Sequence, residues 1–89
     1  MDIKYTGQNL EVTPAIKDYA NKKLSRLSRH GARVTAVQVS FHVEHNDQIA
    51  KATVFVPGHD VFAQQKSNDL YKSIDLLVDK LLTQLDKHS

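Results

Sequence analysis

The chain has 89 residues, of which 40% are hydrophobic and 25% charged, and its formal net charge is +2. This length allows one domain with one core, and the composition is that of a folded rather than a disordered protein. The absence of cysteine excludes disulfides and thiolate metal sites. The N-terminus is polar and every apolar run is too short to cross a bilayer. We therefore expect a single cytoplasmic domain over residues 1–89, without a membrane contact.

The N-terminal part of the chain predicts a strand followed by a helix. Residues 2–7 alternate apolar and polar side chains, as in a half-buried strand. Thr13 followed by Pro14 is typical of a helix start, because the hydroxyl caps the helix and proline suits the first helical position. Apolar residues then recur at helical spacing over residues 14–29. We expect Gly31 to end this helix.

Three further strands are predicted in the middle of the chain. Residues 34–44 alternate almost strictly between apolar and polar side chains, which indicates a strand with one buried face. Residues 45–48 are typical of a hairpin loop. Third and fourth strands are expected over residues 49–56 and 61–65, separated by a Pro-Gly turn.

A second long helix completes the predicted fold. Ser67 can cap a helix from about residue 68 to 87. The order β-α-β-β-β-α indicates an α+β protein in which a crossover makes the first two strands parallel and the last three strands form a meander. We expect a four-stranded sheet with both helices packed on one face and the other face open to water.

Positive charge is concentrated in the first predicted helix and the segment after it. Residues 17–33 hold six of the twelve lysines and arginines and a single carboxylate, Asp18. Lys22, Arg26 and Arg29 are spaced i, i+4 and i+7, so they form one exposed stripe. Like charges at this spacing repel each other, which favours a polyanionic ligand over an ordinary solvated face. Nucleic acid is the commonest polyanion in a cell.

The second predicted helix has basic and acidic side chains on opposite edges. Lys80 and Lys87 share one edge. The other edge carries three aspartates, namely Asp75, Asp79 and Asp86. If the Lys80 edge faces the stripe of the first helix, the two helices form one basic cleft. Lys23 lies nearer the apolar side of its helix, so its stem should pack on the core while its ammonium reaches solvent.

Metal and catalytic sites have little support in the sequence. His42, Glu44 and His45 are near one another, but no further ligand is placed by the sequence, so we expect no metal and no other cofactor. Neither a nucleophile motif nor a glycine-rich phosphate loop is present. We therefore expect no enzymatic activity and no small-molecule substrate.

The aromatic residues favour one mode of RNA binding over another. Tyr5, Tyr19 and Tyr71 fall on faces that we expect to be buried, which leaves no aromatic-rich strand face for stacking unpaired bases. Phosphate and shape contacts to structured RNA are therefore favoured over sequence readout. Leu76 is expected to be exposed between basic positions of the second helix.

Two segments, TGQNLEVTPAIKDYANKKLSRL and NDLYKSIDLLVDKLLTQLDKH, strongly resemble the ribosome hibernation-promoting factors, also labelled sigma-54 modulation proteins. The likeness covers essentially the whole chain. It implies a fold similar to double-stranded RNA-binding domains. It also implies binding to the 30S subunit of the 70S ribosome, in the channel for mRNA and tRNA, where contacts to 16S rRNA silence translation in stationary phase. The residues that the resemblance places against rRNA are Lys22, Lys23, Arg26, Arg29, Lys80 and Lys87.

The resemblance also separates branches of the family. Long members carry a second, dimerising domain, and the short inhibitor branch called protein Y carries a C-terminal tail; the sequence shows neither. It therefore resembles the short promoting type, which implies support of 100S ribosome dimers together with a ribosome modulation factor. Three alternatives stay open: an inhibitor that holds 70S ribosomes inactive without dimers, an interaction protein that modulates a sigma factor, and a general binder of double-stranded RNA.

Overall fold

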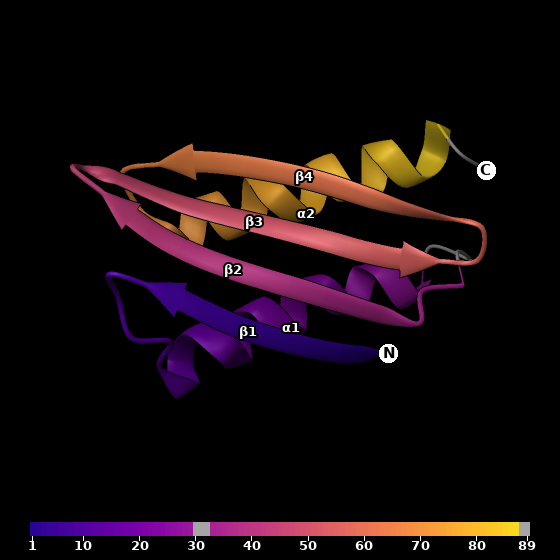
Figure 1. Ribbon diagram of the computed structural model, residues 1–89, viewed down its shortest axis with the longest axis horizontal. Coiled ribbons are helices and arrows are strands. Elements are labelled where there is room, and N and C mark those ends of the chain that lie inside the picture. The colour runs from indigo at the N-terminus through magenta and orange to yellow at the C-terminus, as the bar shows by residue number, and fades with distance from the viewer. Residues whose placement is uncertain (30–32, 88–89) are drawn as a thin grey trace.

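The computed structural model describes residues 1–29 and 33–87. The order of its elements confirms the predicted β-α-β-β-β-α arrangement (Figure 1). The elements are β1 (Asp2–Gln8), α1 (Pro14–Arg29), β2 (Ala36–Glu44), β3 (Asp47–Val56), β4 (His59–Ser67) and α2 (Leu70–Lys87). Gly31, which was expected to end the first helix, lies outside the described residues.

The four strands form one mixed sheet in the order β1-β2-β3-β4. β1 is parallel to β2, whereas β2 and β3, and then β3 and β4, are antiparallel. Because α1 lies between β1 and β2 in the sequence, the predicted crossover unit and meander are both confirmed. The register places Tyr5 opposite Val39 and Val39 opposite Ala52, so one row of side chains runs across the sheet.

Two tight turns let the strands run further than the sequence predicted. His45 has φ 57° and Gly58 has φ 88°, both in the left-handed region that reverses the chain over a short distance. β3 therefore begins at Asp47 instead of residue 49, and β4 extends two residues further at each end than the predicted 61–65. A left-handed histidine carries no signal in the sequence, which explains the difference.

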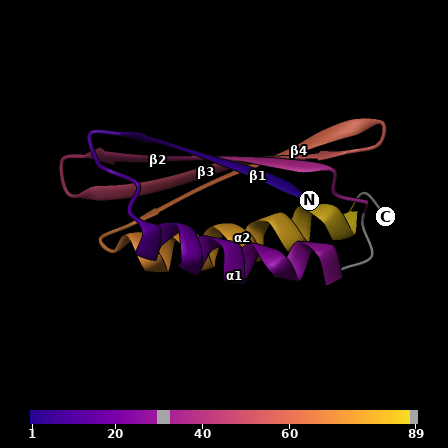
Figure 2. The same cartoon turned by 90° about the horizontal axis from the view of Figure 1, so that it is seen from below.

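Both helices pack on the same face of the sheet and leave its other face open, as predicted (Figure 2). They run side by side in the same direction. The largest side chains of the core are less than 2% exposed and come from both helices and β2: Leu24, Leu27, Phe41, Ile74, Leu77 and Leu81. Burying each of them contributes about 1.5–3 kcal/mol relative to exposure, which fixes the helices on the sheet.

The helix starts are set by side-chain caps. In α1 the hydroxyl of Thr13 accepts a hydrogen bond of 3.2 Å from the backbone N–H of Ile16, as predicted. In α2 the cap is Asp69, whose carboxylate accepts from the N–H of Tyr71 at 3.1 Å. The expectation that Ser67 caps α2 is therefore wrong. Its hydroxyl instead lies 2.7 Å from that of Ser73, which ties the end of β4 to the helix.

Candidate nucleic-acid interface

Three cations of α1, Lys22, Arg26 and Arg29, are exposed on the part of the helix that does not contact the sheet. The apolar side, which includes Leu24 and Leu27, is buried against the sheet. At about 100° per residue, Lys22 and Arg29 lie roughly opposite this side, and both are exposed. No carboxylate of the described residues pairs with either one. We call these two residues, with Arg26 between them, the α1 ridge.

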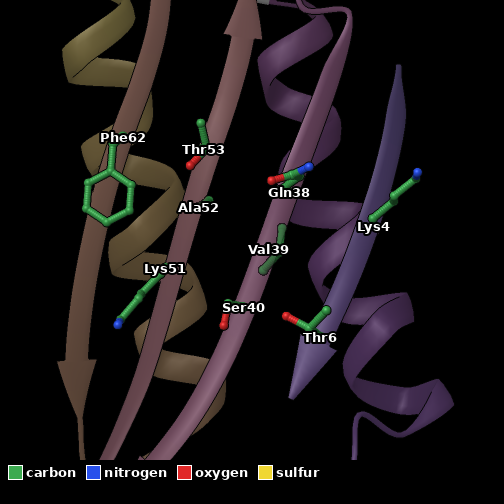
Figure 3. Close-up of a pocket in the computed structure, with 9 residues that line it drawn as sticks. All are labelled: Lys4, Thr6, Gln38, Val39, Ser40, Lys51, Ala52, Thr53 and Phe62. Carbon is green, nitrogen blue, oxygen red and sulfur yellow. The ribbon is translucent and has the colours of Figure 1, made fainter. Parts of the chain in front are cut away.

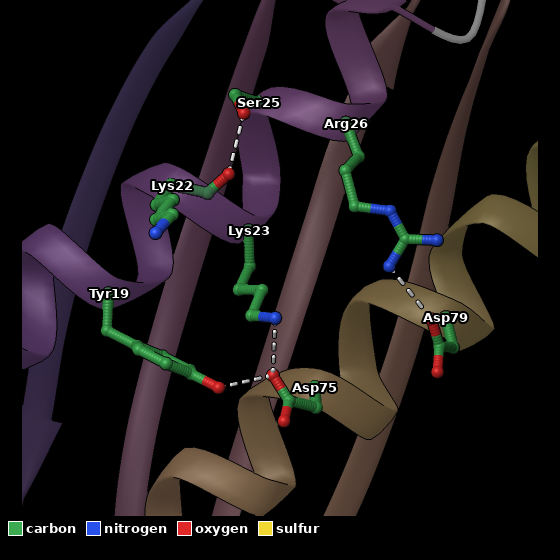
Figure 4. A network of polar contacts seen from close by, with 7 residues as sticks. All are labelled: Tyr19, Lys22, Lys23, Ser25, Arg26, Asp75 and Asp79. Atoms are coloured by element: carbon green, nitrogen blue, oxygen red, sulfur yellow. Dashed lines mark hydrogen bonds and ion pairs between the residues drawn. The ribbon is translucent and has the colours of Figure 1, made fainter.

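The edge of α2 that faces α1 is acidic (Figure 4). Arg26 Nη1 lies 3.1 Å from Asp79 Oδ1, and Lys23 Nζ lies 3.5 Å from Asp75 Oδ1. The phenol of Tyr19 donates a hydrogen bond of 2.7 Å to the same oxygen of Asp75. Two cations of α1 are therefore partly neutralised by carboxylates of its neighbour.

The expectation of one basic cleft between the helices is wrong. Lys80 and Lys87 are exposed, but they lie about 80–100° around α2 from Asp79, away from the edge that meets Arg26. The physical reason is the handedness of the helix. Once α2 runs parallel to α1 with its apolar side on the sheet, Val78 and the aspartates fall on the α1 side and the lysines on the far side.

The predicted RNA-binding residues therefore form two groups on one helix layer. The α1 ridge is one group, and Lys80 with Lys87 is the other. No ion pair to Lys80 or Lys87 occurs in the parts of the chain that the structure describes. Asp75 and Asp79 lie between the groups, so a polyanion that reaches both must pass over an acidic edge.

Lys23 belongs to neither group and is the least exposed of the six predicted RNA-binding residues, with a side chain 35% accessible. The stem was expected to pack near the core, and its partial burial agrees with that. The ammonium lies 3.5 Å from Asp75 Oδ1 and 5.5 Å from the ring centroid of Tyr19. Lys23 therefore connects the two helices, and its ammonium must leave Asp75 or share it to contact a ligand.

The tyrosines divide between burial and exposure. Tyr5 and Tyr19 are half-buried, in agreement with the expected core positions. Burial raises the pKa of Tyr5 to about 12, and the hydrogen bond to Asp75 raises the pKa of the Tyr19 phenol. Tyr71 was expected to be buried but is 39% exposed. It lies on the side of α2 that faces α1, where its ring and that of Tyr19 make an edge-to-face contact.

Leu76 and Phe62 are apolar side chains that project into solvent on opposite sides of the molecule. Leu76 on α2 is 37% exposed, as expected. Phe62 on β4 is 54% exposed on the open face of the sheet. The sequence predicted no aromatic-rich strand face, and one exposed ring does not contradict that, but Phe62 was not singled out. The signal was present in the sequence, because Phe62 alternates with the buried residues Val61 and Ala63.

The described histidines and helices bear on two other kinds of site, metal centres and membrane spans. His42 Nε2 lies 3.5 Å from Glu44 Oε2, and His45 occupies the turn after β2. Among the described residues, no group of three or more His, Cys, Asp and Glu side chains is arranged to hold a metal ion. No helix within residues 1–29 or 33–87 is both long enough and apolar enough to span a bilayer.

The sequence is similar to curated proteins named ribosome hibernation promoting factor. A ribosome hibernation promoting factor from Azotobacter vinelandii is 47% identical over 88 residues, which are 99% of this chain and 82% of that protein. The protein of the same name from Escherichia coli K12 is 35% identical, with 99% of this chain and 93% of that protein covered. The residues of all six elements described above are thus aligned with proteins named for ribosome hibernation.

Solved structures share the fold over the whole chain. A ribosomal subunit interface protein from Coxiella burnetii has a TM-score of 0.91 and 36% identity, with 99% of this chain and 97% of the other covered. The N-terminal domain of Protein Y from Thermus thermophilus has a TM-score of 0.91 and 37% identity, with both chains fully covered. The model of the family described as "Sigma 54 modulation protein / S30EA ribosomal protein" matches residues 3–89. The chain therefore belongs to the sigma 54 modulation protein / S30EA ribosomal protein family.

Proposed function

We propose that this protein is a ribosome hibernation factor that binds 16S rRNA of the 30S subunit through its helix layer and occupies the mRNA and tRNA channel. The names of the relatives support a role in ribosome hibernation. The observation that carries the proposed contact surface is the α1 ridge, because Lys22 and Arg29 are exposed cations without a described carboxylate partner.

Phosphate neutralisation supplies the affinity in this proposal. Lys22, Arg29, Lys80 and Lys87 are available without breaking an ion pair to a described residue, whereas Arg26 and Lys23 must leave Asp79 and Asp75 or share them with the RNA. Each phosphate contact releases counterions, so the affinity falls steeply as salt rises. The helices supply a rigid surface for this contact, because both are fixed to the sheet by the core.

Inhibition is steric and includes no chemical step. A folded domain in the decoding channel excludes mRNA and tRNA for as long as it is bound. In the cytoplasm of a stationary cell, the bound factor silences translation and supports 100S dimers together with a ribosome modulation factor. The likeness to the Protein Y N-terminal domain favours a second candidate, a factor that holds 70S ribosomes inactive without dimers.

Co-sedimentation with 30S subunits and 70S ribosomes at rising salt tests the proposal. We expect saturation near one copy per ribosome, with loss of binding on addition of mRNA and tRNA. Lys22→Glu should weaken binding strongly. Lys66→Glu makes the same charge change at Lys66, whose ammonium lies 3.7 Å from Asp47, and should leave binding nearly unchanged.

Three results would contradict the proposal. Equal affinity for ribosomes and plain duplex RNA would indicate a general RNA binder. Salt-tolerant binding to a sigma factor without RNA would indicate a protein-interaction module. Saturable binding that mRNA and tRNA do not displace would place the site outside the channel. Sucrose gradients with a modulation factor then distinguish the two candidates, because only the first yields 100S particles.

A further inference from the structure

The open face of the sheet has a shallow depression, and the residues that line it come from the strands and not from the helix layer (Figure 3). Its volume is about 350 Å³, in the lower part of the range of about 300–1,000 Å³ that is typical of small-ligand sites. The side chains of Lys4, Lys51 and Phe62 project from this face, on the side of the sheet opposite the helices. The depression is therefore separate from the α1 ridge.

The strand register orders this lining into two neighbouring rows. In the first row, β-strand pairing places Lys4, Gln38, Thr53 and Phe62 next to one another across all four strands. In the second row, it places Thr6, Ser40, Lys51 and Gln64 side by side. Strand and residue spacings put the Cα atoms of Lys4 and Lys51 roughly 12 Å apart, with Phe62 at the edge beside Lys51.

The charge of the depression itself is positive, although Asp2 and Asp60 lie on the same face in the row next to Lys4 and Phe62. Of the described residues that line the depression, none is a carboxylate. Lys4 and Lys51 form no ion pair with any described residue, and Lys51 is only half-exposed, so its stem is held against the sheet. Thr6, Ser40 and Gln38 add neutral groups that can donate or accept hydrogen bonds. Two cations among neutral polar groups favour an anionic ligand at the depression.

Phe62 indicates which chemical group the ligand contains besides its negative charge. Its ring is 54% exposed, although β4 has buried positions on its opposite face. An exposed aromatic ring on an open sheet, with lysines beside it, is the arrangement on which unpaired nucleobases stack. The bases of a duplex are already stacked on one another, so a duplex cannot use the ring in this way.

We propose that the open sheet face binds single-stranded RNA, with a base stacked on Phe62 and successive phosphates paired with Lys51 and Lys4. The helix layer and the sheet face point in opposite directions, so one molecule has two RNA-binding surfaces. Binding at the sheet face needs no contact from the α1 ridge, and it stands or falls independently of the function proposed above.

The test is a titration of ¹⁵N-labelled full-length protein with hexauridylate RNA at low salt, followed by amide chemical shifts and by fluorescence anisotropy of a labelled oligomer. Lys22→Gln/Arg29→Gln serves as the background, because it reduces non-specific binding to the helix layer. We expect shifts at Gln38, Lys51 and Phe62. Uridine monophosphate should bind at least tenfold more weakly than the hexamer, because one phosphate cannot reach both lysines.

Substitutions separate stacking from charge. Phe62→Ala should lower the affinity for the hexamer by about 5- to 100-fold, the effect typical of one lost base–aromatic stack, while Phe62→Tyr retains it. Lys51→Gln should reduce the slope of log affinity against log salt by about 0.7. Tyr71→Ala is the matched control, since it removes an exposed aromatic ring from the helix layer and should have no effect.

The proposal is overturned by any of three results. These are wild-type affinity in folded Phe62→Ala, shifts confined to the helices, and equal binding of the monophosphate and the hexamer, which would indicate a mononucleotide pocket. Binding of a protein partner at Phe62 with no response to the hexamer would also overturn it.

Discussion

Arg26 of α1 donates a hydrogen bond to Asp79 of α2, with Nη1 3.1 Å from Oδ1. The two side chains are 46% and 64% accessible, so this ion pair adds little to the stability of the fold. Its larger effect is on the charge of the α1 ridge. A phosphate that approaches Arg26 competes with a carboxylate that is already in place.

We therefore expect Asp79→Asn to raise the affinity for structured 16S rRNA. The gain should be about 1.5- to 5-fold, since exposed ion pairs are worth about 0.2–1 kcal/mol. Filter binding at several salt concentrations measures it. Asp47→Asn removes a carboxylate beside Lys66, distant in the fold from α1, and is the control. An unchanged or weaker affinity in Asp79→Asn would show that Asp79 does not compete with the RNA.

The two basic groups of the helix layer can be tested against each other. If both contact rRNA, Lys22→Gln/Arg29→Gln and Lys80→Gln/Lys87→Gln should each reduce the salt slope by about 1.8, or about 0.9 per phosphate contact. Titrations of 30S subunits across a salt series give the slopes. A Lys80→Gln/Lys87→Gln variant with the wild-type slope would remove the far edge of α2 from the interface.

The stability of the protein should decline at alkaline pH through Tyr5. This side chain stacks on Phe41 with ring centroids 6.0 Å apart and donates a hydrogen bond to Asn21. Burial raises the pKa of Tyr5 to about 12, whereas an unfolded chain releases this proton near pH 10. Between these values the folded state binds more protons than the unfolded state, so the free energy of unfolding falls as pH rises.

Urea unfolding of wild type and Tyr5→Phe from pH 9 to 12 measures this effect. The stability difference between the two proteins should be constant up to about pH 10 and should then shift against the wild type. The comparison removes the contribution of lysines, which titrate in both proteins. Parallel curves over the whole range would refute the assignment to Tyr5.

Ser73 is a buried polar contact between α2 and the sheet. Its hydroxyl donates to the carbonyl oxygen of Gln48 at 2.6 Å and lies 2.7 Å from the Ser67 hydroxyl. Ser73→Ala removes both contacts and should cost about 0.5–1.5 kcal/mol for each lost hydrogen bond, since the Ser67 hydroxyl keeps Asp69 as a partner. Calorimetry should show a lower Tm, while Ser28→Ala, an exposed hydroxyl on α1, should have little effect. Equal Tm values for wild type and Ser73→Ala would contradict this role.

Gly7 is needed where β1 passes under the loop to α1. A Cβ added there would lie 2.7 Å from the backbone oxygen of Leu10 and 2.9 Å from Val12 Cγ2. Gly7→Ala should therefore destabilise the fold by about 1–3 kcal/mol, as overpacking does. Chemical denaturation measures the change. Wild-type stability would show that the loop shifts to make room.

Most of the fold could be predicted from the pattern of apolar and polar residues, because strand alternation and helical spacing show directly which face each element buries. The strand ends at Asp47 and His59 were less predictable, since the turns depend on the backbone angles of His45 and Gly58. The structure has five of the six candidate RNA-binding residues on exposed helix surfaces and the sixth, Lys23, between the two helices. Which edge of α2 meets α1 could not be read from a helical wheel, because a wheel gives two edges and does not say which neighbour each one faces.

The parallel course of α1 and α2 brings the negative ends of two backbone dipoles to one end of the molecule. Arg29 and Lys87 lie in the last turns of these helices, where a cation is stabilised by about 0.3–1 kcal/mol. Charge reversal at either residue therefore weakens its helix as well as any contact with phosphate. Lys22, in the middle of α1, is free of this coupling, so a loss of RNA binding in a Lys22 variant reports on the interface alone.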